Sequence, residues 1–120
     1  SAERGTRMSY FHDSSAITRR EVAPGVVLRT MWGDKVMMSL VEVAPGAIMP
    51  LHSHPNEQTG IMMQGEFEMT IGGETRVLKP GDAYVIPGGV EHGVVGSEGW
   101  SLALDIFSPP REDYKFTDQA

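Results

Sequence analysis

The feature that most restricts the fold is the regular alternation of short apolar stretches with glycine and proline. Runs rich in Val, Ile, Met and aromatic residues are separated by Pro-Gly or Gly-Gly pairs at roughly the 8–12-residue spacing of β-sandwiches and barrels. These runs are VVLRTMW, KVMMSLVEV, FEMTI, TRVL, AYVI and WSLALDIF. No segment shows the apolar period of about 3.6 residues that marks an amphipathic helix. The sequence therefore predicts an all-β fold.

The turn residues favour an antiparallel arrangement. Gly72-Gly73 separates FEMTI from ETRVL, and a two-residue type I′ hairpin turn needs positive φ at both central positions. An antiparallel domain of this size protects its edge strands best as a closed or double-sheet barrel. Because 120 residues build one hydrophobic core and not two, we expect a single domain over residues 21–120. The polar residues 1–20 should form an arm or an edge strand.

Composition excludes several kinds of site and partner. The chain has no cysteine, which rules out disulfides, thiolate metal sites and thiol nucleophiles. Ten basic against sixteen acidic residues give a net charge of -6, which argues against a nucleic-acid partner. No run approaches the roughly 20 apolar residues of a membrane span. The N-terminus also lacks the basic-then-apolar layout of a signal peptide, so we expect a cytoplasmic protein with no membrane partner.

The segment GAIMPLHSHPNEQTGIMMQG carries two of the four histidines. Side chains of a strand alternate between its faces, so His52 and His54 should point to the same side. Gln58 is an even number of residues further along and should point to that side as well. Glu57 has the opposite parity, although a turn at Pro55-Asn56 could reset the phase. Two imidazoles on one face can reach a single metal ion if the strand bends slightly.

A third histidine has a similar context. His92 follows the turn Pro87-Gly88-Gly89 and should begin the next strand. A single histidine in a strand is usually a surface or hydrogen-bonded residue, and His12 is interpreted in that way. Three histidines with a nearby amide instead indicate a nitrogen and oxygen site for one divalent transition metal: zinc, nickel, manganese or iron.

These two segments resemble the paired motifs of the cupin family. The first runs from Gly46 through His52, His54 and Gln58 to Gly65, and the second from Gly81 through the Pro87-Gly-Gly turn to His92. The resemblance implies a cupin double-stranded β-helix, or jelly-roll barrel, with a metal held by His52, His54, Gln58 and His92. The chain departs from the usual pattern in two places: Gln58 replaces a glutamate and Gly96 an asparagine.

The glutamine bears on the chemistry of the metal. Three neutral imidazoles and a neutral amide leave the charge of the ion uncompensated, which strengthens it as a Lewis acid and disfavours trivalent iron. This favours proton transfer or ring opening over oxygen chemistry, and attracts an anionic substrate. Glu57 stays open as an alternative carboxylate ligand. Gly60 falls on the same strand face as the expected metal ligands and should leave space for substrate beside the metal. Met62, on the same face, should line the wall of the substrate cavity.

The last apolar run, WSLALDIFSPPREDY, allows two arrangements. Parity places Leu102, Leu104 and Ile106 on one face and Asp105 and Phe107 on the other. Either the leucine face turns to the core and Asp105 to water, or Asp105 and Phe107 face the barrel cavity. In the second case a partner subunit or the N-terminal arm covers the leucine face, which predicts a homodimer.

A narrower resemblance favours the second arrangement. HSHPNEQTG and the ending DIFSPPREDY together resemble the KdgF family of pectin and alginate breakdown. The resemblance implies an enzyme that linearises 4,5-unsaturated uronate monosaccharides into open-chain keto acids. It assigns catalysis to Asp105 as general acid and base, substrate carboxylate binding to Arg111, and sugar packing to Phe107. The alternatives are another metal-dependent cupin enzyme, such as a polyketide cyclase or a dioxygenase, and a non-enzymatic cupin that binds a sugar or a metal.

Overall fold

The computed structural model describes residues 9–117, and its regular secondary structure is almost entirely β-strand. Its elements in chain order are η1 (Ser14–Ala16), β1 (Arg20–Ala23), β2 (Val26–Trp32), β3 (Met37–Val43), β4 (Ile48–His52), β5 (Glu57–Gln64), β6 (Phe67–Ile71), β7 (Glu74–Leu78), β8 (Ala83–Ile86), β9 (His92–Gly96), β10 (Ser101–Ser108) and η2 (Glu112–Tyr114). The two η elements are single-turn 3-10 helices. The all-β prediction is confirmed.

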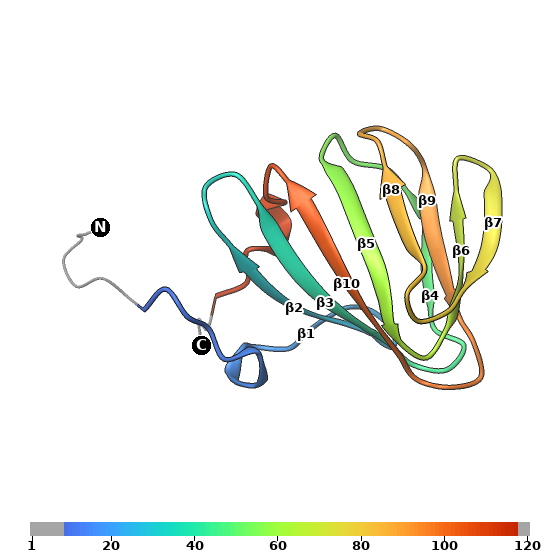
Figure 1. Cartoon of the computed structure of the whole chain (residues 1–120), viewed down its shortest axis with the longest axis horizontal. Helices are drawn as coiled ribbons and strands as arrows, with labels where there is room; N and C mark the ends of the chain where they lie inside the picture. Colours follow the sequence, from blue (N-terminus) through green and yellow to red (C-terminus); the bar gives the residue numbers. More distant parts are fainter. Residues whose placement is uncertain (1–8, 118–120) are drawn as a thin grey trace.

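The strands form two antiparallel sheets that face each other (Figure 1). The larger sheet has the order β1-β2-β3-β10-β5-β8, and the smaller has the order β4-β9-β6-β7. Strand β10 lies at the centre of the larger sheet, paired with β3 on one side and β5 on the other. This is the expected jelly-roll barrel, and it places β10 between two strands that lie far earlier in the sequence.

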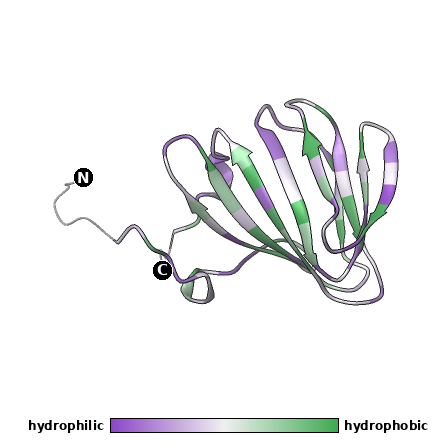
Figure 2. Ribbon diagram, in the orientation of Figure 1, coloured by the Kyte–Doolittle hydropathy of each residue, from purple (hydrophilic) through white to green (hydrophobic). Residues whose placement is uncertain are grey.

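Local sequence explains where the strands end. Three strands, β2, β6 and β8, coincide with the predicted runs VVLRTMW, FEMTI and AYVI. The hairpin between β6 and β7 has φ of 55° at Gly72 and 84° at Gly73, as a type I′ turn requires. Within β2 the inward residues Val26, Leu28 and Thr30 are buried while their neighbours are not. Figure 2 shows that hydrophobic and hydrophilic residues are interspersed along the strands.

The core consists of two clusters of buried apolar side chains. One cluster contains Val43, Met62, Phe67, Met69, Leu78, Tyr84, Ile86 and Ala103. The other contains Val26, Leu28, Met37, Phe107 and Tyr114. Full burial of one large apolar side chain stabilises a fold by about 1.5–3 kcal/mol, so these residues dominate the stability of the barrel.

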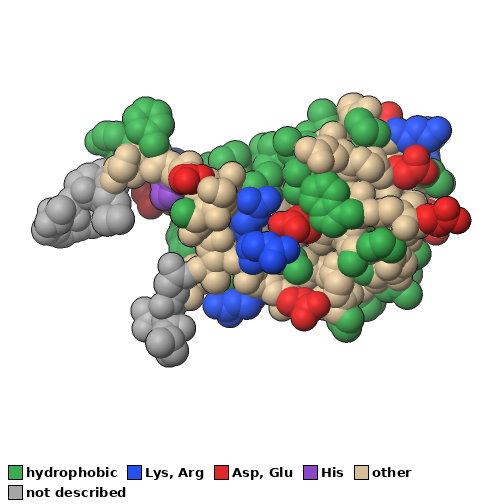
Figure 3. All heavy atoms as spheres, turned by 90° about the horizontal axis from the view of Figure 1, so that it is seen from below, with side chains coloured by type: hydrophobic (Ala, Val, Ile, Leu, Met, Phe, Trp, Pro, Cys, Tyr) green, Lys and Arg blue, Asp and Glu red, His purple; other side chains and the backbone are tan. Residues whose placement is uncertain are grey.

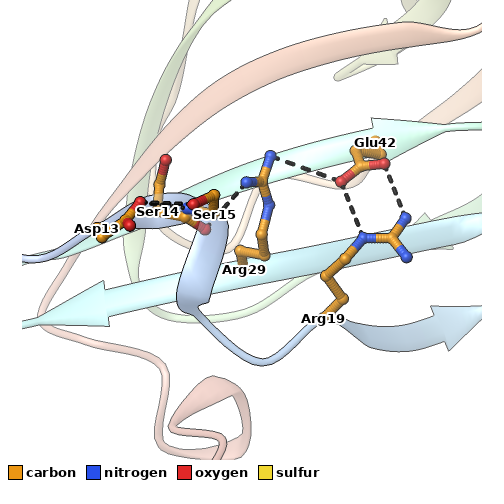
Figure 4. A network of polar contacts seen from close by, with 6 residues as sticks. All are labelled: Asp13, Ser14, Ser15, Arg19, Arg29 and Glu42. Atoms are coloured by element: carbon orange, nitrogen blue, oxygen red, sulfur yellow. Dashed lines mark hydrogen bonds and ion pairs between the residues drawn. The ribbon is translucent and has the colours of Figure 1, made fainter.

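Hydrogen bonds and ion pairs hold the segment before β1 on the outer face of the larger sheet (Figure 4). Arg29 of β2 donates to the backbone oxygen of Ser14 over 3.0 Å and forms an ion pair with Glu42 of β3. Arg19 binds the same carboxylate at 2.9 Å. Hydrogen bonds from Arg19 are the largest cause of the lowered pKa of Glu42. Of the arm or edge strand predicted over residues 1–20, residues 1–8 lie outside the described part of the chain.

The two faces of β10 differ as its sequence requires. Asp105 and Phe107 are buried inside the barrel, which is the second of the two arrangements considered for this strand. Leu104 lies on the outer face and pairs in register with Ile61. Apolar side chains on this outer face remain partly exposed, among them Ile61 at 40% and Met63 at 45%. Their cover by a partner subunit stays a prediction.

Charged side chains are mixed on the surface. On the face seen in Figure 3, Lys and Arg side chains lie beside Asp and Glu side chains. Within residues 9–117, no helix has the length and apolar character that crossing a membrane requires. The predicted absence of nucleic-acid and membrane partners stays a prediction.

Candidate metal and substrate site

Three histidines meet at the end of the barrel where β10 ends, drawn uppermost in Figure 1. His52 ends β4 and His92 begins β9, and the two are register partners whose ring centroids lie 4.4 Å apart. His54 lies two residues beyond the end of β4, and its ring centroid is 5.0 Å from that of His92. One ring nitrogen from each histidine lies within 4.8 Å of the others. The bend after β4 thus brings His54 round to the cluster.

A backbone carbonyl fixes the orientation of each of the three rings. Nδ1 of His52 lies 2.8 Å from the oxygen of Pro50, Nδ1 of His54 lies 3.0 Å from that of Asn56, and Nδ1 of His92 lies 2.9 Å from that of Val90. A carbonyl only accepts hydrogen bonds, so each Nδ1 carries the proton and each Nε2 presents a lone pair. This arrangement is typical of metal-binding histidines.

The buried ring of His92 supports the same conclusion. Its Nε2 is buried and has no hydrogen-bond partner among residues 9–117. Burial lowers the pKa of His92 to about 4. Burial, followed by the positive charge of Arg111, also lowers the pKa of His54. Both rings are therefore neutral near pH 7, as metal ligation requires.

Gln58 supplies an oxygen to the cluster. It begins the inner face of β5, is only 5% exposed, and places Oε1 3.0 Å from Nε2 of His54. Its own Nε2 donates to Oδ2 of Asp105 over 3.1 Å, which fixes the orientation of the amide. Oε1 and the His54 nitrogen then face each other as two lone-pair donors, and a shared cation satisfies both. Glu57, in contrast, is exposed and has the opposite parity.

The four residues fit a divalent metal. They offer three imidazole nitrogens and one amide oxygen, which suits zinc, nickel, manganese or iron(II).

Asp105 is the buried carboxylate nearest this cluster. It accepts hydrogen bonds from the Tyr84 hydroxyl and from Gln58. Burial raises the pKa of Asp105 to about 6, and the two hydrogen bonds partly oppose that rise. Burial, reinforced by the charge of Asp105, raises the pKa of Tyr84 well above its usual value, so its hydroxyl stays a proton donor.

Gly60 does not leave open space for substrate, contrary to the sequence-based expectation. It lies in register between Asp105 of β10 and Tyr84 of β8. A Cβ at Gly60 would collide with the Asp105 carboxylate and the Tyr84 ring. The missing side chain therefore makes room for the hydrogen-bonded pair of Tyr84 and Asp105.

Met62 is also corrected. It points inward as parity predicts, but it is 1% exposed and packs within the core cluster of Phe67 and Ile86. It is not among the residues that line the cavity beside the histidines. Its position gives it a packing contact in place of the expected substrate contact.

Phe107 of β10 and Arg111, which follows that strand, lie beside the histidines. The Arg111 guanidinium lies 3.9 Å from the centroid of the Tyr114 ring and forms an ion pair with Asp113 at 2.9 Å. The Phe107 ring meets that of His54 edge-on, with centroids 5.7 Å apart. One cavity is lined by the functional candidates His52, Gln58, His92, Asp105, Phe107 and Arg111.

Sequence reasoning missed two polar residues that line this cavity, Ser39 and Tyr84. Tyr84 lies in the run AYVI, where parity places it on the same face as the buried Ile86. That parity was a usable signal for an inward tyrosine, but nothing local indicated its partner. Ser39 gave no signal, because serine in a strand is common on either face.

Comparisons with known proteins agree with the geometry. Residues 39–106 match the cupin domain family. The pectin degradation protein KdgF of Dickeya dadantii is 44% identical over 84 residues, which cover 69% of this chain and 76% of that protein.

Two solved structures share the fold. The structure of KdgF from Halomonas sp. has a TM-score of 0.81 at 35% identity, covering 88% of this chain and 98% of that one. An RmlC-like cupin from Shewanella frigidimarina has a TM-score of 0.82 at 26% identity, covering 89% and 96%. The chain therefore belongs to the cupin family and, within it, is a small single-domain cupin of the KdgF type.

Proposed function

We propose that this protein is a metal-dependent enzyme of pectin or alginate breakdown that opens the ring of 4,5-unsaturated uronate monosaccharides to give keto acids. The observation that carries the proposal is that Asp105 and Arg111 line the same cavity as His52 and His92 of the histidine cluster. The similar protein KdgF from Dickeya dadantii is a pectin degradation protein, which supports the same substrate class.

The proposed reaction is a proton relocation. The anomeric hydroxyl loses a proton and the C1–O5 bond breaks, so that C1 becomes an aldehyde and the former ring oxygen, which takes up a proton, becomes an enol at C5. Protonation at C4 with loss of the enol proton then gives the ketone at C5. No oxidant and no second substrate are needed. A bound divalent metal supplies Lewis acidity that polarises substrate oxygens.

Asp105 suits the proton transfers. Its pKa of about 6 lies near neutral pH, where a carboxyl group can both accept and return a proton. Gln58 and Tyr84 hold the two carboxylate oxygens in place. Because Asp105 is buried in the cavity wall, the proton is moved with little competition from bulk water.

Arg111 suits the substrate carboxylate. A guanidinium pairs with a carboxylate through two parallel hydrogen bonds, and this one is largely shielded from solvent. Its stacking on Tyr114 fixes the plane of the fork. Phe107, beside His54, offers an apolar surface to the face of the sugar ring.

The test is turnover of unsaturated galacturonate freshly released by a lyase, followed as loss of the ultraviolet absorbance of the conjugated C4=C5 bond. Metal-loaded protein should accelerate this loss, while chelator-treated protein and the Asp105→Ala variant should not. Arg111→Lys should raise KM because the fork geometry is lost, and Glu112→Gln, an exposed neighbour, serves as its matched control.

Loss at the uncatalysed rate in every sample would reject this substrate. Oxygen consumption with an aromatic substrate would then point to a dioxygenase, and tight sugar binding without turnover to a binding protein.

A further inference from the structure

A row of inward-facing residues crosses the larger sheet beside the candidate site. Register pairing runs from Thr30 of β2 to Ser39 of β3, then to Asp105 of β10, Gly60 of β5 and Tyr84 of β8. Four of these five residues carry a polar group into an otherwise apolar interior. Their hydrogen bonds therefore need to be accounted for one by one.

Every polar side chain of this row is paired except one. The Thr30 hydroxyl donates to the backbone oxygen of Tyr114 at 2.6 Å, and Tyr84 donates to Asp105. The Ser39 hydroxyl is fully buried and has no hydrogen-bond partner among the described residues. An unpaired buried hydroxyl is destabilising, so Ser39 presents a free hydrogen-bonding group to a ligand that enters the cavity it lines.

Ser39 also faces the right space. It lines the cavity that Asp105, Arg111, His52 and His92 also line. It lies directly opposite Asp105 in the ladder, and side chains in such a pair have Cβ atoms about 4.5–5.5 Å apart. A ligand group in contact with the Asp105 carboxylate is therefore within reach of the Ser39 hydroxyl.

We propose that Ser39 is a substrate-binding residue that hydrogen-bonds a hydroxyl of the sugar acid and so selects for hydroxylated substrates. This inference rests on the proposed function, because it takes the ligand to be a uronate. A site with a buried polar group discriminates strongly against ligands that lack the matching hydroxyl, since binding them leaves that group unpaired.

The test compares two variants that remove a buried unpaired hydroxyl. Ser101 is as buried as Ser39, and its hydroxyl also has no partner within residues 9–117. It lies at the start of β10 and does not line the cavity, so Ser101→Ala is the matched control for Ser39→Ala. Both variants should raise Tm, by roughly 2–5 °C, because each removes an unsatisfied group from the substrate-free protein.

The two variants should differ in substrate binding. With metal-loaded protein and unsaturated galacturonate, Ser39→Ala should raise KM by about 3- to 10-fold at little cost in kcat, the effect of one lost neutral hydrogen bond. Ser101→Ala should leave KM unchanged. An unchanged KM in Ser39→Ala, or a lowered Tm in that variant, would overturn the proposal, because a packing role lowers stability.

Calorimetry with saturated galacturonate separates this proposal from the proposed reaction. That sugar keeps the carboxylate and the hydroxyls but has no double bond to react. If wild-type protein binds it without turning over the unsaturated sugar, the proposed reaction fails, and the same 3- to 10-fold loss of affinity in Ser39→Ala would still support the role of Ser39. If wild-type protein binds neither sugar acid, both proposals are wrong.

Discussion

Changing Gln58 to glutamate would restore the residue that is usual in cupins but would place its carboxylate next to that of Asp105. Nε2 of Gln58 donates to Oδ2 of Asp105 over 3.1 Å, and the change replaces this donor by an oxygen. Two unit charges at that distance repel by about 5 kcal/mol at the effective dielectric constant of about 20 found for protein sites. The glutamine is therefore required by the buried Asp105.

Proton uptake limits this cost and makes it depend on pH. Protonating Asp105, whose pKa of about 6 makes it the easier of the two carboxyls to protonate, costs about 3 kcal/mol at pH 8 and almost nothing at pH 5. Denaturant unfolding of chelator-treated protein should thus show Gln58→Glu to be less stable than wild type by about these amounts. Chelation is needed because a bound cation would offset the added charge.

The matched variant is the double substitution Gln58→Glu with Asp105→Asn. It restores a donor and an acceptor with their roles reversed, so it should recover most of the stability lost at the higher pH. Equal stability of wild type and Gln58→Glu at both pH values would refute the reasoning. A double variant no more stable than the single one would refute it as well.

Three further predictions concern the barrel. Gly60→Ala should lower the free energy of unfolding by about 1–3 kcal/mol through overpacking, while Gly33→Ala, with open space around its Cβ, should change it by less than about 0.5 kcal/mol; thermal unfolding measures both. In chelator-treated protein, the lowered pKa of His92 contributes stability that is fully present above pH 6.5 and is lost as the pH falls through about 4. The raised pKa of Asp105 has the opposite effect, because it lowers the stability as the pH rises from 3.8 through about 6. Asp105→Asn removes the opposing effect, so its stability should fall more steeply on acidification than that of wild type, and parallel denaturation profiles would contradict this. Ile61→Asp on the outer face should convert the predicted dimer to a monomer in sedimentation experiments, and a monomeric wild-type protein would contradict the dimer itself.

The fold and the meeting of the three histidines were predictable because they depend on local patterns. Glycine and proline mark the turns, and two-residue alternation assigned Asp105 and Phe107 to a common face of β10. Alternation alone could not decide which face of that strand looked inward, and the resemblance to KdgF decided it. His54 lies beyond the end of β4, so its place in the cluster depends on the bend after the strand and not on strand parity.

The residues that sequence reasoning missed depend on pairing between distant strands. Ser39, Gly60 and Tyr84 fall into one row with Asp105 only once β3, β10, β5 and β8 are in register. A glycine can leave room for a ligand or for another side chain, and the two cases look alike in a sequence. The Gly60 expectation was wrong because the complementary tyrosine comes from a strand 24 residues further along the chain.

The backbone acceptors behind the three histidine rings have an evolutionary consequence. Each Nδ1 is held by a main-chain carbonyl, of Pro50, Asn56 or Val90, and no side-chain substitution can delete such an acceptor. Mutations in the cavity wall, at positions such as Ser39 or Arg111, can therefore alter what is bound without disturbing how the imidazoles point. Ligand preference can therefore change while the histidine cluster is inherited intact, which makes one barrel a starting point for many reactions.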